Sequence, residues 1–429
     1  MVWMMKDSSS PIARCPPSAA RLGAMTSTGT DLSIEEYFDR LHALVRALPA
    51  ERAPLVQGRV LAEPLFARLP LPPRDNSAMD GFLIPAPASP DDLTTPFTLP
   101  VIGDVPAGSP TQVPQPGTAV RIMTGGEVPE GFDGLVIPVE NTDVPLGPGP
   151  VPETVTVHHL PDRNHIRRRG SHISAGHQLA GSATLVDAPL IAASLSSGVD
   201  SAVVHRIPRV TIIATGEELI NGQLSDSNGP MLEALISSTG LCEITRTVCG
   251  DSPIELQRRF NAAAADSDLI VTTGGVSAGA FDVVRAVIED SVERDSYWFG
   301  HVNQRPGAPQ GHALWDGIPV VCLPGNPVAA FVSAHLYLTQ LLRSLRGLPR
   351  PAGVKDRPCL TAVAGADFPE PHHPLIQPCS ITMTESITAS PPPGPRMRSH
   401  HVAALPGTHG FALLTSPVAA GEQLTVYPY

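Results

Sequence analysis

Val210-Thr-Ile-Ile-Ala-Thr-Gly-Glu-Glu-Leu219 is the stretch that decides the fold, because a short apolar run passes directly into a loop of glycine and carboxylates. The same arrangement recurs at Leu269-Ile-Val-Thr-Thr-Gly-Gly275 and at Val320-Val-Cys-Leu-Pro-Gly-Asn326. Short, nearly continuous apolar runs are typical of parallel strands that are buried on both faces. We therefore expect three such strands, each with a special loop at its carboxyl end.

Helical segments separate these strands in the sequence. Alternation of strands and helices is the pattern of an α/β domain built on a parallel sheet, which we expect over residues 209–346. The predicted helices are Pro230–Ser238, Ile254–Ala265, Asp282–Glu289 and Ala329–Leu345.

The sections on either side of the α/β domain have a different character. Residues 75–157 carry short β-branched segments punctuated by proline and glycine, which favours a small β-rich domain. Residues 351–429 contain short strand-like pieces, and we expect a small β-barrel or sandwich there. The strands predicted in the two sections are Phe97–Val101, Thr118–Met123, Leu135–Val139, Thr154–Val157, Phe411–Leu414 and Gln423–Val426.

The N-terminal part begins with a stretch rich in Ser, Pro and Ala, and we expect residues 1–30 to be a disordered extension. Ser33 to Leu48 reads as an amphipathic helix, in which Ser33 and Glu36 form a capping box. Residues 31–74 and 158–208 together are expected to form a helical and extended linking domain.

Composition narrows the function classes. The chain has 429 residues, 42% hydrophobic and 16% charged, and a formal net charge of −12. An acidic chain argues against a nucleic-acid-binding surface, and an apolar run of about 18 residues, as a membrane span needs, does not occur. The six cysteines show no C-x-x-C pairing. We expect a cytoplasmic protein with reduced thiols, without nucleic acid or membrane partners.

The three strand-terminal loops predict a site for a phosphorylated ligand. Ligands of open parallel sheets bind at the carboxyl ends of the strands, and glycines let backbone N–H groups approach phosphate oxygens. The residues concerned are Thr215, Gly216, Gly274, Gly275, Ser277, Pro324, Gly325 and Asn326.

Carboxylates accompany these loops, and their roles stay open at this stage. Asp282 precedes a predicted helix, so it suits an N-cap as well as it suits a ligand of Mg²⁺ beside phosphate. Asp226 and Asn228 precede another helix, where capping is favoured for each taken singly.

Two polar segments outside the α/β domain are also singled out. Asp75-Asn-Ser-Ala-Met-Asp-Gly81 has the composition of a solvated turn, but Met79 in its middle favours a loop folded against other residues. Ile166-Arg-Arg-Arg-Gly170 is the strongest basic cluster of the chain. Its arginines form either a solvated face or a grip on phosphate through bidentate contacts.

In combination, these segments resemble the molybdopterin molybdenumtransferase family, whose relatives include the E-domains of gephyrin-like proteins. The matching segments occur in the family's order between about residues 31 and 346. They are Leu71–Gly81, Arg121–Gly125, Ile166–Gly170, Thr215–Leu219, Asp226–Asn228, Thr273–Ser277, Pro306–Gly307 and Leu323–Pro327.

The resemblance implies an elongated homodimer with four domains per subunit, and a Mg²⁺-dependent enzyme. Its substrates would be molybdate and adenylylated molybdopterin, with AMP released as the metal enters the dithiolene. A molybdopterin adenylyltransferase or an acceptor molybdoenzyme would be its protein partner.

The resemblance also assigns roles to residues. Glu218, Asp251 and Asp282 match acidic positions for the metal ion and hydrolysis, and Asp75 joins them as a catalytic residue. Thr124 and Asp75 would face the α/β pocket across the dimer interface. The substrate-binding positions would include Arg167, Arg168, Arg169, Asp226, Asn228, Arg305, Pro306 and Gly307, together with the glycine-loop residues named above.

The chain departs from the family at several positions. Arg305-Pro-Gly-Ala-Pro309 stands where the family commonly has Lys-Pro-Gly-Lys-Pro, and His301 replaces a further lysine. Ala308 and His301 leave open a paralogue that binds the pterin or a partner protein without efficient metal insertion. A molybdopterin adenylyltransferase is a third interpretation of the α/β domain, which the segment Asp75–Gly81 disfavours.

Overall fold

The computed structural model describes residues 31–86, 94–276, 282–394 and 397–429. The chain divides into two compact units. The first comprises the described residues up to Glu51, Gly58–Ala62 and Val204–Tyr429, and the second comprises Arg52–Gln57 and Glu63–Val203. The finer domain boundaries expected from the sequence stay a prediction.

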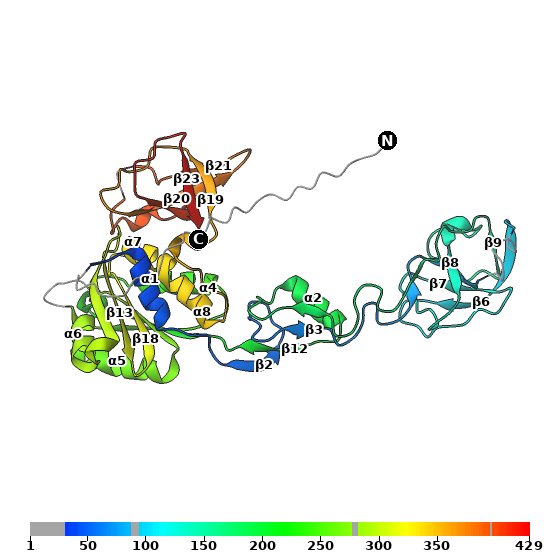
Figure 1. The fold of residues 1–429 in the computed structure, drawn as a ribbon, viewed down its shortest axis with the longest axis horizontal. Helices are drawn as coiled ribbons and strands as arrows, with labels where there is room; N and C mark the ends of the chain where they lie inside the picture. Colours follow the sequence, from blue (N-terminus) through cyan, green and yellow to red (C-terminus); the bar gives the residue numbers. More distant parts are fainter. Residues whose placement is uncertain (1–30, 87–93, 277–281, 395–396) are drawn as a thin grey trace. The chain divides into compact units, whose positions relative to one another are not determined.

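The first unit contains the sheet to which β13 and β18 belong (Figure 1). It has seven strands, in the order β1-β16-β17-β18-β15-β13-β14. The three strands predicted from the sequence, β13, β15 and β18, are adjacent to one another. The strand bounds are Asp31–Leu32 for β1, Arg209–Thr215 for β13, Glu243–Cys249 for β14, Leu269–Thr273 for β15, Tyr297–Val302 for β16, Pro309–Trp315 for β17 and Ile318–Leu323 for β18.

The expectation of a parallel sheet is correct for β14, β13, β15 and β18 but wrong for β17, which runs antiparallel to both of its neighbours. The reason is the tight turn at Asp316-Gly317, where both residues have positive φ (+48° and +80°). An Asp-Gly pair between two strands favours a two-residue hairpin, whose strands must be antiparallel.

Helices cover both faces of this sheet. One hydrophobic core joins α1, α4, α7 and α8 to one face, and a second core joins α5 and α6 to the other. The bounds are Ile34–Ala43 for α1, Glu217–Ile220 for α3, Asn228–Ser238 for α4, Pro253–Asp266 for α5, Val283–Ser291 for α6, Pro327–Ser333 for α7 and Thr339–Leu345 for α8.

The predicted capping box of α1 is confirmed, because the Ser33 side chain accepts from the Glu36 N–H and Glu36 reaches back to the Ser33 N–H. The helix predicted from Ala329 to Leu345 contains a π-helical turn, Ala334–Leu338, between α7 and α8.

The C-terminal part of the first unit is a closed five-stranded barrel, which confirms the barrel alternative. Its strand order is β19-β21-β20-β22-β23. The bounds are Leu360–Ala364 for β19, Leu375–Met383 for β20, Ile387–Ser390 for β21, Gly410–Leu414 for β22 and Gln423–Pro428 for β23. Phe411 and Tyr427 of the barrel belong to the same core as α7 and α8, so barrel and sheet pack together.

The second unit contains a five-stranded sheet, ordered β8-β5-β7-β6-β9, in the region expected to be β-rich. The second unit also contains the helix α2 and two separate two-stranded ribbons, β4 with β10 and β3 with β11. The bounds are Leu65–Phe66 for β3, Asn76–Ser77 for β4, Gly81–Pro85 for β5, Phe97–Val105 for β6, Ala119–Ile122 for β7, Gly134–Pro138 for β8, Thr154–Val157 for β9, Ile166–Arg167 for β10, Gln178–Ala180 for β11 and Ala188–Ser196 for α2. β2 (Ala50–Pro54) and β12 (Ser201–His205) pair with each other at the boundary of the units.

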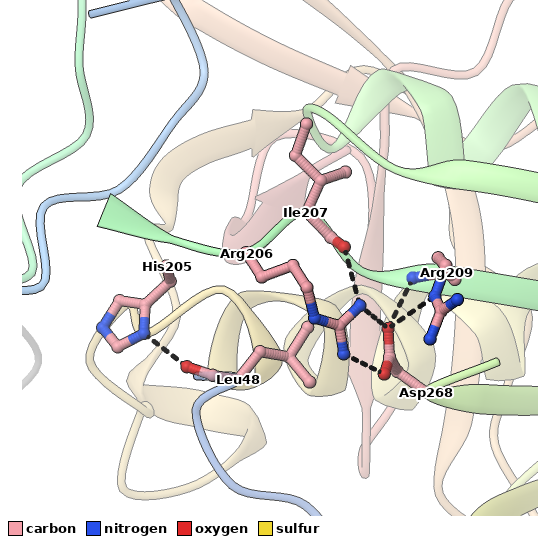
Figure 2. Close-up of polar contacts among 6 residues, drawn as sticks. All are labelled: Leu48, His205, Arg206, Ile207, Arg209 and Asp268. Atoms are coloured by element: carbon pink, nitrogen blue, oxygen red, sulfur yellow. Dashed lines mark hydrogen bonds and ion pairs between the residues drawn. The ribbon is translucent and has the colours of Figure 1, made fainter. Parts of the chain in front are cut away.

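A polar cluster fixes the chain where it enters β13 (Figure 2). The Asp268 carboxylate accepts two hydrogen bonds from the Arg206 guanidinium and one of 2.8 Å from the Arg209 N–H. His205 Nδ1 lies 2.7 Å from the Leu48 carbonyl oxygen. This half-buried carboxylate thus joins the amino ends of β13 and β15.

Among the helices of the described residues, none is long and apolar enough to cross a membrane.

Candidate functional site

A cavity of about 750 Å³ lies in the first unit, where the loops after β15 and β18 meet the barrel. The sheet side contributes the glycine loops, and the barrel side contributes a second wall. The lining residues are Gly274, Gly275, Val276, Asp282, Arg305, Pro306, Gly307, Ala308, Pro309, Pro324, Gly325, Asn326, Ala329, His372, His373, Leu375, Met397, Arg398 and Ser399. The structure therefore brings together two of the three predicted strand-terminal loops with the Arg305-Pro306-Gly307 segment.

Asn228 holds these loops to one another. Its side-chain amide donates to the Thr273 hydroxyl at 2.8 Å and to the Gly325 carbonyl at 2.7 Å. The loop after β15 also needs its glycines, since Gly274 and Gly275 have φ values of +94° and +65°. Asn228 thus links the two loops beside the cavity. The Asp226 carboxylate instead accepts a hydrogen bond from the Gly229 N–H at 2.8 Å. The local role that the sequence favoured for Asp226 agrees with this geometry.

Two guanidinium groups give the cavity its positive charge. Arg305 comes from the loop between β16 and β17, and Arg398 comes from the barrel. Both side chains are exposed, and neither has a hydrogen bond or ion pair with any residue that the structure describes. Free guanidinium groups in a concave surface attract anions and present a fork that matches phosphate and other oxyanions.

Asp282 is the carboxylate that lines the cavity. It occupies the N-cap position of α6, yet among the described residues its side chain makes no capping hydrogen bond. Of the two roles that the sequence left open, the cap therefore loses support. A half-buried carboxylate beside glycine loops retains the chemistry of a hard-cation ligand.

Glu218 and Asp251 do not line the cavity. They are exposed at the carboxyl ends of β13 and β14, where the neighbouring Glu217 carboxylate accepts from the Asp251 N–H at 3.3 Å. The Gly216 N–H donates to the Cys249 carbonyl and so joins the two loops. Thr215 is buried, and its hydroxyl lies 3.4 Å from the Thr273 carbonyl oxygen.

In the described part of the chain, no three His, Cys, Asp or Glu side chains are grouped to hold a metal ion. Glu218, Asp251 and Asp282 therefore form no ready-made cage. Mg²⁺ is commonly held by one or two carboxylates together with substrate phosphates, and Asp282 fits that arrangement.

In the second unit, Asp75 and the arginine cluster contact each other. Arg168 Nη1 donates to Asp75 Oδ2 at 2.7 Å, and the Arg169 N–H donates to Asp75 Oδ1 at 2.6 Å. Asp75 is only 8% exposed, so this pairing satisfies a carboxylate that would be costly to bury alone. Arg167 and Arg169 have exposed side chains.

Thr124 is joined to Asp80. Its N–H and its hydroxyl both donate to Asp80 Oδ1, at 2.6 and 2.7 Å. The Thr124 N–H, followed by its hydroxyl, holds the pKa of the Asp80 carboxyl below its usual value. The resemblance assigns a role to Thr124 and none to Asp80, although Asp80 lies in the segment Asp75–Gly81.

The barrel residues of the cavity were also missed from the sequence. His372, His373, Met397, Arg398 and Ser399 stand in no motif, and only the fold brings them to the glycine loops. The Val328 N–H at the start of α7 donates to the Ser399 carbonyl at 3.0 Å and holds this wall in place. Ser277, predicted to bind substrate, lies outside the described residues.

Ala308 and His301, which stand where the family commonly has lysines, lie in different surroundings. Ala308 lines the cavity and is 9% exposed. His301 is exposed, with Nδ1 3.8 Å from the Asp31 carboxylate, and does not line it.

Comparison with known families and proteins gives consistent results. Residues 32–198 match the family described as MoeA N-terminal region (domain I and II), and residues 211–344 match the family described as probable molybdopterin binding domain. Molybdopterin molybdenumtransferase 2 of Mycobacterium tuberculosis H37Rv is 34% identical over 420 residues, which cover 92% of this chain and 99% of that protein. Molybdopterin molybdenumtransferase of Haemophilus influenzae is 29% identical over 392 residues, covering 86% and 91% of the two chains.

A solved structure shares the fold. The molybdopterin biosynthesis MoeA protein of Pyrococcus horikoshii OT3 superposes with a TM-score of 0.71 at 21% identity, over 93% of this chain and all of that one. At that identity the likeness concerns the fold.

Proposed function

The chain belongs to the molybdopterin molybdenumtransferase family, and from that premise we propose that it inserts molybdate into adenylylated molybdopterin and releases AMP in a Mg²⁺-dependent step. The observation that carries the proposal is the cavity, where glycine loops and two guanidinium groups, unpaired among the described residues, surround a carboxylate. A phosphate-rich pterin and an oxyanion need those donors, and a cation beside phosphate needs that acceptor.

Each cavity residue has a definite task in this proposal. Arg305 and Arg398 bind the anionic groups of the two substrates and hold them together. The backbone at Gly274-Gly275 and Pro324-Gly325 lets phosphate oxygens approach closely. Asp282 would hold Mg²⁺, which when bound neutralises charge on the phosphates as AMP leaves. Glu218 and Asp251, at the carboxyl ends of β13 and β14, would support the metal ion and the hydrolysis together with Asp282.

The second unit supplies further groups in this proposal. Of the two carboxylates Asp75 and Asp80, Asp80, which pairs with Thr124, is the better candidate to act on the substrate. The Asp75 carboxylate already accepts hydrogen bonds from the Arg168 side chain and the Arg169 N–H. Arg167 and Arg169 are exposed and available for phosphate. We propose a homodimer in the cytoplasm, in which these groups act on the cavity of the partner subunit. A molybdopterin adenylyltransferase would deliver the substrate, and an acceptor molybdoenzyme would take the product.

The test follows AMP release from adenylylated molybdopterin with Mg²⁺, with and without molybdate. We expect molybdate-stimulated AMP release that falls at least about 100-fold in Asp282→Ala, because removing one key electrostatic group commonly costs that much. Asp290→Ala, which removes an exposed carboxylate at the other end of α6, serves as the control and should keep the wild-type rate.

Two other functions would give different results. Ala308 places a methyl group in the cavity where the family commonly has a charge, which favours a paralogue that binds the pterin without efficient metal insertion. Such a protein would bind pterin tightly and release no AMP. An adenylyltransferase would consume ATP, although the second unit with its Asp75–Gly81 segment disfavours that reading.

A further inference from the structure

A buried polar network lies beneath the cavity loop that carries Arg305. Its side chains are Gln304, Gln310, Ser333 and Tyr337, of which none is more than 1% exposed. Gln304 and Gln310 flank the loop, whereas Ser333 ends α7 and Tyr337 lies in the π-helical turn after it. The network thus connects the loop to the helix packed against it.

The hydrogen bonds of the network converge on the loop backbone. Gln310 Nε2 donates to the Gly307 carbonyl at 2.8 Å and to Ser333 Oγ at 2.6 Å. Gln304 Nε2 donates to the Pro306 carbonyl at 3.1 Å and to Ser333 Oγ at 3.3 Å. The Tyr337 hydroxyl donates to Gln304 Oε1 and fixes the orientation of that amide.

Backbone hydrogen bonds fix the same loop from the other side. The Val302 N–H donates to the Ala308 carbonyl at 2.7 Å and closes the loop. The Arg305 N–H donates to the Pro374 carbonyl at 2.9 Å, and the Arg305 carbonyl accepts from the Ile376 N–H at 2.7 Å. At Gly307 φ is +87°, and a Cβ there would lie 3.0 Å from Ser333 Oγ. The backbone is therefore immobilised while the Arg305 side chain stays exposed in the cavity.

Burying this network has a cost that apolar side chains would avoid. A buried amide costs free energy for each polar atom that lacks a hydrogen bond, and Gln310 Oε1 has no partner among the described residues. The Nε2 groups of both glutamines donate their hydrogen bonds to the loop backbone and to Ser333. Their placement makes sense if the position of the loop matters more than the packing of the core.

We propose that Gln304 and Gln310 are positioning residues that set the oxyanion affinity of the cavity by fixing the backbone that carries Arg305. The inference rests on the proposed function to the extent that the cavity takes an oxyanion. Because the energy of a charge-assisted hydrogen bond depends on geometry, a displaced Arg305 binds the anion less well.

The experiment measures the Kd of molybdate, without pterin, by titration calorimetry on the full-length protein. Gln310→Met keeps the side-chain volume and removes both donated hydrogen bonds, so we expect the Kd to rise about 10-fold. In an Arg305→Ala background the same substitution should change the Kd less than about 2-fold, because the network acts through Arg305. Gln340→Met is the matched control, since Gln340 is a buried glutamine that donates to Thr339 and not to the loop.

The outcomes separate the inference from the proposed function. An equal rise in Kd with and without Arg305 would overturn the inference and leave the network a merely structural one. If wild-type protein binds no molybdate, both the inference and the cavity assignment fail. If molybdate binds and responds as expected but no AMP is released, only the proposed function fails. Ser333→Ala tests the same network should Gln310→Met not fold, with the same expected dependence on Arg305.

Discussion

The cavity of the first unit and the Asp75–Gly81 loop of the second both involve charged residues, but the charges are paired in one region and not in the other. In the cavity, the side chains of Arg305 and Arg398 have no hydrogen bond or ion pair within the ranges that the structure describes. In the second unit, Asp75 of the loop pairs with Arg168 of the arginine cluster. A paired charge stabilises its own loop, whereas an unpaired cation in a concave surface is available to an anionic ligand.

The difference follows from burial. Asp75 is 8% exposed, and a carboxylate so far from water requires a partner. Arg305 is exposed and its charge is solvated, so its position has to be set through its backbone instead. The same residue types therefore stabilise one region and serve binding in the other.

The largest effect should come from the cavity. We expect Arg305→Ala to lower kcat/KM for molybdate-dependent AMP release about 100-fold, through loss of an anion-binding group. Its free energy of unfolding in urea should change by less than about 0.5 kcal/mol, since the side chain makes no contact that folding needs. Arg258→Ala, which removes an exposed arginine on α5, is the control and should alter neither quantity. A large loss of stability in Arg305→Ala would contradict the distinction between cavity charges that serve binding and paired charges that serve stability.

The second effect concerns two aspartates of one loop. Asp75→Asn should cost about 2 kcal/mol of unfolding free energy, because a partly buried ion pair with Arg168 is lost. Asp80→Asn should cost less stability than Asp75→Asn, because Asp80 is exposed, and should lower AMP release about 10-fold, since the carboxylate beside Thr124 loses its charge. Urea denaturation and initial rates measured on both variants decide the matter. The reverse assignment of the two effects would refute the distinction.

A smaller effect should be a loss of unfolding free energy when the pH is lowered. Burial lowers the pKa of His312 to about 4 and that of His335 to about 3, compared with 6.5 for an unburied histidine. The unfolded chain therefore binds protons that the folded chain does not, and stability falls as pH drops from 6.5 toward these values. Each histidine should contribute about 1 kcal/mol per pH unit.

Urea denaturation between about pH 6.5 and pH 5 measures this slope. His335→Gln should reduce the slope by one proton, because the replacement does not titrate. An unchanged slope would mean that His335 is protonated in the folded protein.

The smallest effect should follow restoration of a charge. Ala308→Lys should lower the KM for molybdate about 3-fold, because a cation enters the cavity wall beside Arg305. His301→Lys should have no effect, since His301 is exposed outside the cavity. Equal effects of the two substitutions would show that long-range charge, and not the cavity, governs the affinity.

Local patterns in the sequence predicted most elements of the sheet unit. The buried strands β13, β15 and β18 and helices α4, α5 and α6 were found within a few residues, because their apolar runs and periodicities are local signals. The capping box of α1 was found for the same reason. The antiparallel β17 was missed, although the Asp316-Gly317 turn that causes it is itself a local signal.

The sequence by itself determined the family, the α/β alternation and the glycine loops, since each depends on residues adjacent in the chain. Tertiary structure alone decided which charges are free and which are paired. Asp75 lies 93 positions from Arg168, and Arg398 reaches the cavity only through the barrel. Such pairings depend on long-range packing and on burial, which sets whether a charge must find a partner or remains available to a ligand.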